Sequence, residues 1–442
     1  MPSVYDLVLR DGESLDQKLV TLRAGGGTYV LENGTILDGT GRTLKGRLVI
    51  RGDRIADITT DPRPVPGATV IDCRGATILP GLFDLHMHYH GHTGERDRFL
   101  SYLSPPPGVR VIRQAFDAYS TLAHGVTTAR SLGHGDSDHT FGLRESIAAG
   151  LIHGPRIYHV GWAIAPTDWH EPSPLPWSMF RELRSTLWTH ADGEAELREI
   201  LRENAAEGAD ATKIYLPPHD VPGEGPFTEE ELRVIVEESH RLGRRVAVHV
   251  KTAAHVRRAV EAGVDCMEHG PDEVDEDLLA LMAERGTFLV PTLAVYNRIS
   301  EVAEEFSYPQ AMVDAIRREL EGRMRNVLRA KEMGIRVGAG SDVGARAGFG
   351  YLAVKELDLL VQTGFTPMEA ITAATSVSAD VLGVAGQLGS IAPGKLAEIV
   401  VIDGDPLADI TIFQRPAAIR HIFQAGDHLD PEVYPSAVGI PV

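Results

Sequence analysis

Two histidines separated by a single residue, His86 and His88, lie at the end of an apolar segment in the first quarter of the chain. If that segment is a strand, both side chains point to the same face, because alternate residues of a strand share a face. Asp84 lies two residues earlier on that face, where its carboxylate could orient one of the imidazoles. Imidazole nitrogens are common ligands of transition-metal ions. The spacing therefore predicts a metal site at the carboxyl end of this strand.

Four further residues of ligand type follow in the chain, each inside or at the end of a strand-like run: Lys213, His249, His269 and Asp342. Each of them alone is also consistent with a buried structural residue or a cap, and Lys213 with a lysine that extends past a strand end into solvent. Their matching positions on successive strands favour a shared site. In a parallel barrel the carboxyl ends of the strands meet at one face, where active sites lie. We therefore expect the six side chains to converge there.

The elements that would carry these residues are short apolar runs, which alternate with helical segments through the middle of the chain. The runs occupy residues 82–87, 126–129, 156–161, 212–216, 245–250, 264–267, 287–293 and 336–339. One helix has clear boundaries, because Thr228 and Glu231 form a capping box before it and Gly243 ends it shortly after Arg241. Strands that alternate with helices in this way are typical of a parallel barrel. We therefore predict an α/β fold with a (β/α)₈ barrel, the TIM barrel, as the catalytic domain over residues 81–388.

The two ends of the chain have a different sequence pattern, which is typical of short strands separated by turns. Strand-like segments are expected at 29–31, 47–51, 54–58 and 69–71, and near the other end at 399–403 and 419–425. Neither end is long enough to form a solid core alone. We therefore predict that residues 1–80 and 389–442 pair into one small β-sandwich domain that is discontinuous in sequence.

The charge balance restricts the possible partners. The 442 residues include 62 acidic and 43 basic side chains, and the net charge of −19 argues against nucleic acid or an anionic membrane surface. Cys73 and Cys266 are far apart in the sequence, so no disulfide framework is expected, which fits a reducing compartment. No signal peptide or membrane-spanning run is recognisable. These features predict a cytoplasmic protein that acts on a small molecule, and we also expect a homo-oligomer.

Four segments together carry a specific resemblance to a known family: Pro80–His88, Gly125–Arg130, Ala262–Gly270 and Gly389–Lys395. In these segments the chain resembles the amidohydrolase superfamily, in particular the branch of imidazolonepropionase-like hydrolases and Xaa-Pro or Xaa-Arg dipeptidases. The resemblance extends over nearly the whole chain. It implies a metal-dependent hydrolase on the barrel fold.

The resemblance further implies a binuclear centre with two divalent ions, expected to be zinc, whose ligands are His86, His88, Lys213, His249, His269 and Asp342. The first two histidines would hold the more buried ion together with Asp342, and the last two histidines would hold the second. Lys213 would carry a CO₂-derived carbamate that bridges both ions. General chemistry agrees, because burial beside cations lowers the pKa of a lysine and leaves the neutral amine that captures CO₂. Deaminases of the same fold typically use one ion and no bridging lysine.

The expected reaction is hydrolysis of an amide-like C–N bond by a hydroxide that bridges the two ions. Asp342 would accept the hydroxide proton and return it to the departing amine, while His170 or Tyr215 would stabilise the carbonyl oxygen. The substrate could be a dipeptide, an N-acyl amino acid, a carbamate, a urea or an anilide. Two alternatives stay open. One is a hydrolytic deaminase or imidazolone ring-opening amidohydrolase of the same fold, and the other is a non-catalytic scaffold, which would have no use for six ligand positions.

The loops after the third and fourth strands differ from those of relatives in this branch. Asp168-Trp169 precedes His170 where relatives tend to have two glycines, and Pro217-Pro218-His219 replaces a glycine-rich stretch. Trp169, His170 and Tyr215 are therefore the expected substrate residues. Aromatic residues in or beside these loops are Tyr89, Trp162, Trp169, Trp177 and Tyr215. These side chains either form a substrate cage or pack the loops, and we expect a substrate with a flat or bulky apolar group beside the scissile bond.

Overall fold

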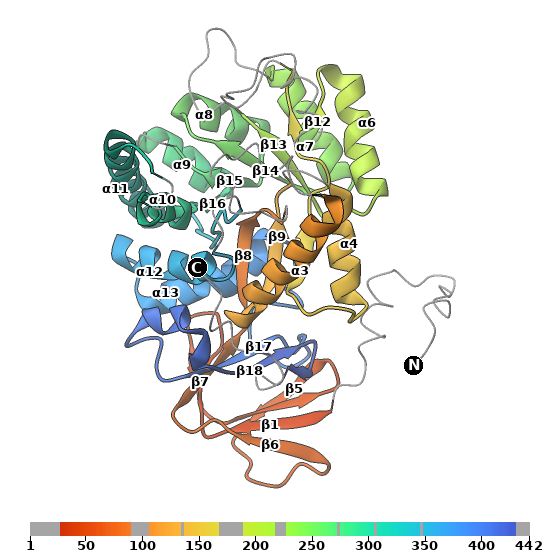
Figure 1. Cartoon of the computed structure of the whole chain (residues 1–442), viewed down its shortest axis with the longest axis vertical. Coiled ribbons are helices and arrows are strands. Elements are labelled where there is room, and N and C mark those ends of the chain that lie inside the picture. The colour runs from red at the N-terminus through yellow and green to blue at the C-terminus, as the bar shows by residue number, and fades with distance from the viewer. Residues whose placement is uncertain are drawn as a thin grey trace.

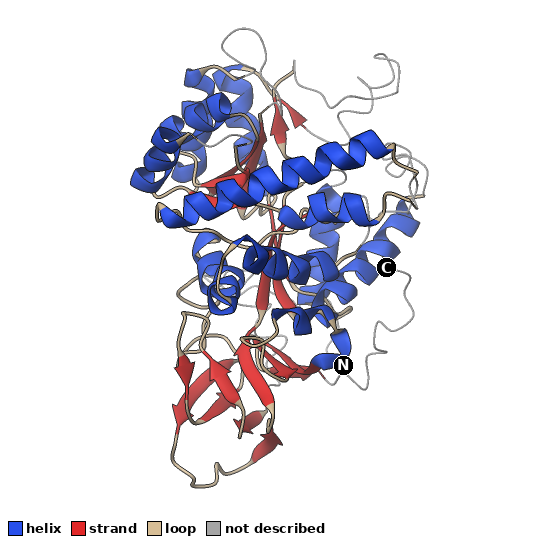
Figure 2. Ribbon diagram, turned by 90° about the vertical axis from the view of Figure 1, so that its left-hand side faces the viewer, coloured by secondary structure: helices blue, strands red, loops and turns tan. Residues whose placement is uncertain are grey.

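The structure, a computed structural model, describes residues 27–89, 106–133, 137–167, 189–216, 227–271, 275–304, 307–344 and 348–429. Two regions that differ in secondary structure follow each other along the long axis of the molecule (Figure 1). Short strands from both ends of the chain form one region, and parallel strands flanked by helices form the other. The side view shows the same division, with strands and few helices at the lower end (Figure 2).

Seven of the eight expected parallel strands are present in the described residues. They are β8 (Leu82–Met87), β9 (Val126–Ser131), β10 (Arg156–His159), β13 (Ala211–Tyr215), β14 (Arg245–Val250), β15 (Cys266–His269) and β16 (Phe288–Val290). With the short β11 (Ile164–Ala165) and β12 (Thr189–His190), they form two sheets of order β10-β9-β8 and β12-β11-β13-β14-β15-β16. Every strand pair in both sheets is parallel. The predicted α/β class is therefore confirmed.

The eighth expected strand, at 336–339, is not a regular strand, yet it bridges the two sheets. Gly338 N donates to Leu289 O of β16 at 2.9 Å, and Leu85 N of β8 donates to a carbonyl of the same segment at 2.9 Å. The residue directly before β13, the third strand of the six-stranded sheet, donates its N–H to His159 O of β10 at 2.7 Å. Main-chain hydrogen bonds therefore reach the six-stranded sheet from both sides of the three-stranded sheet.

Helices follow most of these strands along the chain. They are α3 (Pro107–Ala123), α4 (Ser137–Ala148), α6 (Gly193–Ala206), α7 (Glu229–Arg241), α8 (Ala253–Ala262), α9 (Glu276–Arg285), α10 (Leu293–Glu301), α11 (Gln310–Glu332), α12 (Tyr351–Thr363), α13 (Pro367–Thr372) and α14 (Ser378–Val381), with the π-helical η2 (Ala373–Val377) between the last two. Helix α7 confirms the predicted capping box. Glu231 N donates to the Thr228 hydroxyl at 3.2 Å, and Thr228 N donates to the Glu231 carboxylate at 2.7 Å.

The two ends of the chain share one sheet. A four-stranded sheet contains β5 (Arg54–Thr59), β4 (Arg47–Arg51), β1 (Thr28–Glu32) and β6 (Ala68–Asp72). A six-stranded sheet contains β19 (Asp427–Leu429), β18 (Ile419–Gln424), β17 (Ile399–Asp403), β7 (Ala76–Pro80), β2 (Thr35–Leu37) and β3 (Thr43–Leu44). The six strands expected near the ends are all present, and β2, β3, β7 and β19 are additional. Because β17 pairs with β7 in antiparallel fashion over five residues, neither end completes this sheet alone.

Apolar side chains of both terminal sheets are buried in one cluster. Leu31 and Ile50 from the four-stranded sheet lie in this cluster with Ile78, Ile399 and Phe423 from the six-stranded sheet, and all five are fully buried. The two terminal sheets therefore share one apolar core, and the β-sandwich itself stays a prediction. The division into a discontinuous domain of residues 1–80 and 389–442 and a barrel domain of residues 81–388 stays a prediction.

A single glycine, Gly81, joins the terminal sheets to β8, the strand that carries His86. Gly81 lies between β7 and β8, and its N–H donates to Glu398 O at 2.9 Å. A side chain at this position would collide with Thr127 of β9. The terminal sheet therefore fixes the start of the strand that carries His86.

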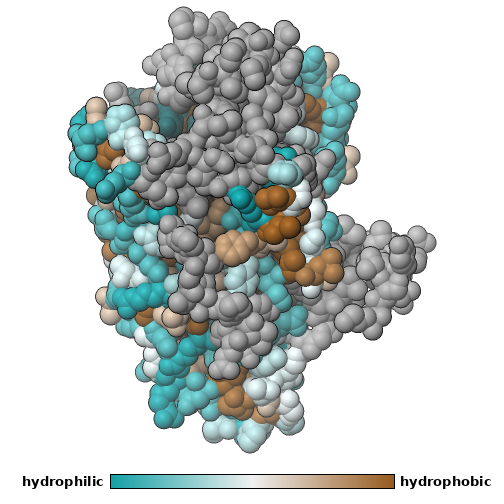
Figure 3. Space-filling model, viewed as in Figure 1, coloured by the Kyte–Doolittle hydropathy of each residue, from teal (hydrophilic) through white to brown (hydrophobic). Residues whose placement is uncertain are grey.

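Apolar side chains are exposed along the outer side of α3, where Figure 3 shows them gathered in one area: Val109, Val111, Ile112 and Phe116. Ile112, for example, is 72% exposed. Exposed apolar patches often mark contacts with other proteins, and the expected homo-oligomer stays a prediction. Both cysteines are buried and free. Within the described ranges, no helix has the length and apolar character needed to cross a membrane.

Candidate metal centre

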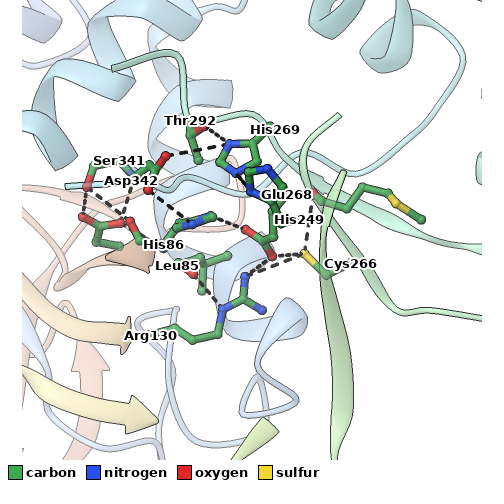
Figure 4. A network of polar contacts seen from close by, with 12 residues as sticks. Leu85, His86, Arg130, His249, Cys266, Glu268, His269, Thr292, Ser341 and Asp342 are labelled. Atoms are coloured by element: carbon green, nitrogen blue, oxygen red, sulfur yellow. Dashed lines mark hydrogen bonds and ion pairs between the residues drawn. The ribbon is translucent and has the colours of Figure 1, made fainter. Parts of the chain in front are cut away.

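All six expected ligand residues lie in the described part of the chain, at the same end of the parallel strands. They are His86 in β8, His88 directly after it, Lys213 in β13, His249 in β14, His269 at the end of β15 and Asp342 after the bridging segment. Figure 4 shows the side chains of His86, His249, His269 and Asp342 turned toward one another. Because the strands are parallel, their carboxyl ends bring these distant residues together.

The first group consists of His86, His88 and Asp342. Asp342 Oδ1 lies 3.5 Å from His86 Nε2 and 3.1 Å from His88 Nε2. One ligand atom each from His86, His269 and Asp342 lies within 4.8 Å of the others, as in a site able to hold a metal ion. Burial by itself would raise the pKa of the Asp342 carboxyl group. The His86 and His88 imidazoles and the Lys213 amine have the larger, opposite effect and hold that pKa below its usual range. The group thus offers two imidazole nitrogens and an ionised carboxylate.

The second group is the pair His249 and His269. His269 Nε2 lies 2.8 Å from His249 Nδ1, and the ring centroids are 4.5 Å apart. Burial holds the pKa of both imidazoles well below its usual range, so both rings are neutral. Two neutral ring nitrogens at this distance share either a proton or a cation. The two nitrogens are therefore close enough to bind one ion that lies off the line joining them, since zinc–nitrogen bonds are about 2.0–2.1 Å long.

Lys213 is the most unusual residue of the site. Its side chain is fully buried, and its Nζ has no hydrogen-bond partner among the described residues. Nζ lies 5.2 Å from the ring centroid of Tyr215, which is two residues later on the same face of β13. Burial lowers the pKa of the amine to about 8, although Glu268 acts in the opposite direction. Burying an amine without a hydrogen-bond partner is unfavourable in free energy. The Lys213 amine therefore fits a side chain that gains its partner from a group added to it.

Three of the expected ligand histidines use one ring nitrogen for a supporting contact and leave the other directed into the site. His86 Nδ1 lies 2.7 Å from Glu268 Oε2, His88 Nδ1 lies 2.8 Å from Gly133 O, and His269 Nδ1 lies 2.7 Å from Thr292 Oγ1. Metal-binding histidines almost always have such an acceptor on the second nitrogen, which fixes the ring and its tautomer. The residues present therefore fit a metal centre.

Glu268 and Arg130 belong to the site although no role follows for them from the sequence. Glu268 is fully buried, and its second oxygen accepts a hydrogen bond from Arg130 at 2.5 Å. Arg130 also donates to Leu85 O, beside the first histidine, at 2.7 Å. Both residues lie in segments that carry the family resemblance. Strand alternation would place Glu268 and His269 on opposite faces, and they act at one site because His269 has a φ of 71°.

Asp84 contacts the main chain rather than an imidazole, which corrects its expected role. Its carboxylate accepts hydrogen bonds from His86 N at 3.1 Å, Ser341 N at 2.9 Å and the Ser341 hydroxyl at 2.5 Å. Burial raises the pKa of this carboxyl group to about 6. Asp84 therefore ties the segment before Asp342 to β8, while Glu268 orients the His86 ring.

The aromatic residues divide into two kinds. Tyr215 is buried beside the site, with its ring centroid 5.3 Å from that of His249. Tyr89 packs instead against Phe349 at 5.4 Å, and its hydroxyl donates to Thr121 at 3.2 Å, so it belongs to the core. Trp162 is held through its main chain by Asn204. Trp169, His170, Trp177 and the segment 217–219 lie outside the described residues.

Comparisons with known proteins agree with this architecture. Residues 77–429 match the amidohydrolase family. Ochratoxinase of Aspergillus niger is 28% identical over 433 residues, which cover 90% of this chain and 85% of that protein. Its crystal structure, at 26% identity, has a TM-score of 0.79 and covers 92% of this chain and 96% of its own.

Two solved peptidases are similar to the same extent. A prolidase in complex with N-methylphosphonate-L-proline is 30% identical, with a TM-score of 0.80, and covers 91% of this chain and 99% of its own. An Xaa-Pro dipeptidase with methionine in its active site is 27% identical, with a TM-score of 0.78, and covers 91% and 100%. The match to the family extends over most of the chain and includes the strands of the candidate site. The chain therefore belongs to the amidohydrolase family.

Proposed function

We propose that this amidohydrolase is a binuclear, metal-dependent enzyme that hydrolyses an amide C–N bond in a dipeptide or an N-acyl amino acid. The observation that carries the proposal is the Lys213 amine. It is fully buried without a hydrogen-bond partner among the residues that the structure describes, its pKa is lowered to about 8 by burial, and it lies among the candidate ligands. The similarity to a prolidase and an Xaa-Pro dipeptidase supports the substrate class. Carbamates, ureas and anilides are further amide-like bonds within the reach of this chemistry.

The same proposal assigns the fold in detail. The segment 336–339 would be the eighth strand of a closed (β/α)₈ barrel, because its main chain is hydrogen-bonded to β16 on one side and β8 on the other. A closed barrel would present all carboxyl strand ends at one mouth. The terminal strands would form the companion sandwich beneath it.

The proposed ligand sets follow from the two groups of the site. His86, His88 and Asp342 would hold one ion, expected to be zinc, and the pair His249 and His269 would hold the other. Lys213 would join them as a carbamate: the neutral amine adds to CO₂, a C–N bond forms, and one proton leaves. Bound divalent ions lower the pKa of water and polarise a carbonyl group.

The residues of the chain supply the proton transfers and the orientation. Asp342 is ionised and sits between both groups, so it can accept the proton of the attacking water and return it to the departing nitrogen. The Tyr215 hydroxyl and the His170 imidazole are the proposed donors to the substrate carbonyl oxygen. Trp169 would contact the substrate side chain. Most of the candidate ligands are buried, and electrostatic contacts are stronger there than in water.

Metal content and a product screen test the function together. Purified protein loaded with Zn²⁺ should hold two ions per chain and release an amine from Xaa-Pro dipeptides or N-acyl amino acids. One ion per chain with ammonia release from an amino heterocycle would support the deaminase alternative, and opening of an imidazolone ring the cyclic amidohydrolase. A chain that binds no metal would support a scaffold and overturn the proposal.

A further inference from the structure

Thr292, which supports the proposed ligand His269, stands at an unusual helix start. It is the residue before α10, the position where a threonine hydroxyl ordinarily accepts a hydrogen bond from the first turn. Threonines before α7, α8 and α13 do so, with φ between −66° and −85°. Thr292 has a φ of 53° and makes no such bond. Its hydroxyl instead lies 2.7 Å from His269 Nδ1.

A residue from another helix takes over the capping of α10. Glu356 of α12 is fully buried, and its two carboxylate oxygens accept hydrogen bonds from Leu293 N at 3.1 Å and Ala294 N at 2.7 Å. Those two N–H groups are among the four that a helix start leaves without partners inside the helix. A buried carboxylate is costly unless its oxygens are satisfied. Here the backbone of α10 satisfies both oxygens.

The two arrangements depend on each other. Because Glu356 caps the helix, the Thr292 hydroxyl is not needed there and can hold the His269 ring. Without Glu356, the hydroxyl would compete for the free N–H groups of α10, as threonine side chains do elsewhere in this chain. Arg323, which is 1% exposed, fixes the same histidine from behind by donating to His269 O at 3.1 Å. The histidine is thus held at its ring and at its main chain.

We infer that Glu356 and Thr292 are positioning residues that hold His269 for the second metal ion, and that their loss weakens this ion selectively. The inference rests on the proposed binuclear function, because His269 is a ligand only in that proposal. With Thr292 as the acceptor, His269 Nδ1 carries the hydrogen and Nε2 keeps its lone pair for the ion. The rings of His86 and His88 are oriented by Glu268 and Gly133 instead, so the ion that they would hold with Asp342 would stay bound.

Zn²⁺ titration of metal-stripped protein, followed by calorimetry in bicarbonate buffer, tests the inference. Wild-type protein should bind two ions. Thr292→Val removes the acceptor at nearly constant shape, and Glu356→Gln replaces one acceptor oxygen with an amide donor. Both variants should bind one ion with wild-type affinity and the other about 10- to 100-fold more weakly. Thr292→Ser keeps the hydroxyl and should restore both affinities.

Matched controls separate positioning from stability. Thr366→Val removes an ordinary threonine cap at α13, and Glu238→Gln changes a buried helix glutamate that binds arginines on α6 and α7. Both controls should unfold at a lower temperature yet bind two ions as the wild type does. Equal affinities in all variants, equal losses in the controls, or a Thr292→Ser protein that behaves like Thr292→Val would each overturn the inference. A wild type with fewer than two ions would overturn the proposed function itself, and the inference with it.

Discussion

Lys213 offers the most direct test of the proposed chemistry. Its amine is buried and has no hydrogen-bond partner within the described ranges, which is unfavourable in free energy. A carbamate at this position would replace the unpaired amine with a bridging anion. Lys213→Ala should lose most of the activity and bind two ions less tightly, and small carboxylic acids with added metal should restore part of the activity. Ion counting and turnover with a cleaved substrate measure both effects.

A second lysine serves as the control for this experiment. Lys395 is partly buried, and its Nζ contacts Ser390 Oγ at 2.6 Å and Ala385 O at 2.6 Å, away from the site. Lys395→Ala should lower the stability and leave the ion count at two. Full turnover with two tightly held ions in Lys213→Ala would exclude the carbamate.

Asp342 is proposed to move a proton as well as to bind an ion. Asp342→Asn keeps a carbonyl oxygen for the ion but cannot accept a proton. General acid–base catalysis typically contributes about 10²- to 10⁴-fold. We expect this variant to retain two ions while its turnover falls by at least about 10²-fold. Turnover within a few-fold of the wild type, with metal in place, would limit Asp342 to a ligand.

At the residue scale, the sequence predicts which side chains converge at the candidate site, but not the residues that hold them in place. Few side chains bind metals, so His86, His88 and Asp342 are recognisable from type and spacing. Glu268 and Thr292 act through hydrogen bonds that exist only after distant strands meet. Ordinary glutamates and threonines have no local pattern that announces such a role.

At the scale of elements, the regular parts were predictable and the departures from regularity were not. The period-two strands and the capping box at Thr228 follow from local rules. The strand ends at the site break those rules, because His269, Thr292 and Asp342 have φ values of 71°, 53° and 54°. Such left-handed residues, uncommon outside glycine, turn side chains toward the site. The bridging segment 336–339 is also irregular, although its main chain is hydrogen-bonded to β16 and to β8.

The loops that follow the strands should determine substrate preference. Trp169 stands where relatives of this branch tend to have glycine, and we propose that its ring contacts a flat or bulky apolar substrate group. Trp169→Gly should raise the KM for an aromatic substrate by a factor that corresponds to a loss of about 1–3 kcal/mol of binding free energy. The two ions should stay bound. Parallel kinetics with a small aliphatic substrate provide the comparison. An equal effect on both substrates would assign Trp169 to loop packing.

At the scale of the whole molecule, the terminal sheets and the candidate site are directly connected through the chain. Strand β7 pairs with β17 from the other end of the chain and runs through Gly81 into β8, which carries His86. Short strands at each end were predictable from their residues. Their pairing across more than 300 positions was predictable only from the argument that neither end could form a core alone.

This continuity predicts that the C-terminal strands are needed for the metal site. Deletion of residues 389–442 removes β17 and β18, exposes the apolar faces of β7 and β1, and should destabilise the whole protein rather than release an independent tail.

A point substitution in the same cluster measures the contribution of the terminal sheets to stability. Ile399→Ala empties part of the apolar cluster between the terminal sheets and should lower the free energy of unfolding by about 2–5 kcal/mol.

The exposed Val70 of β6 provides the matched control, since Val70→Ala should change the free energy of unfolding by less than about 0.5 kcal/mol. Urea unfolding of Ile399→Ala, followed by circular dichroism and by release of bound Zn²⁺, should give one coincident transition at a lower urea concentration. Coincidence is expected because β7 and β8 are consecutive, so loss of the terminal sheets releases the strand that holds His86. Two separate transitions, or a truncated chain that retains two ions and activity, would show instead that the barrel folds without its companion.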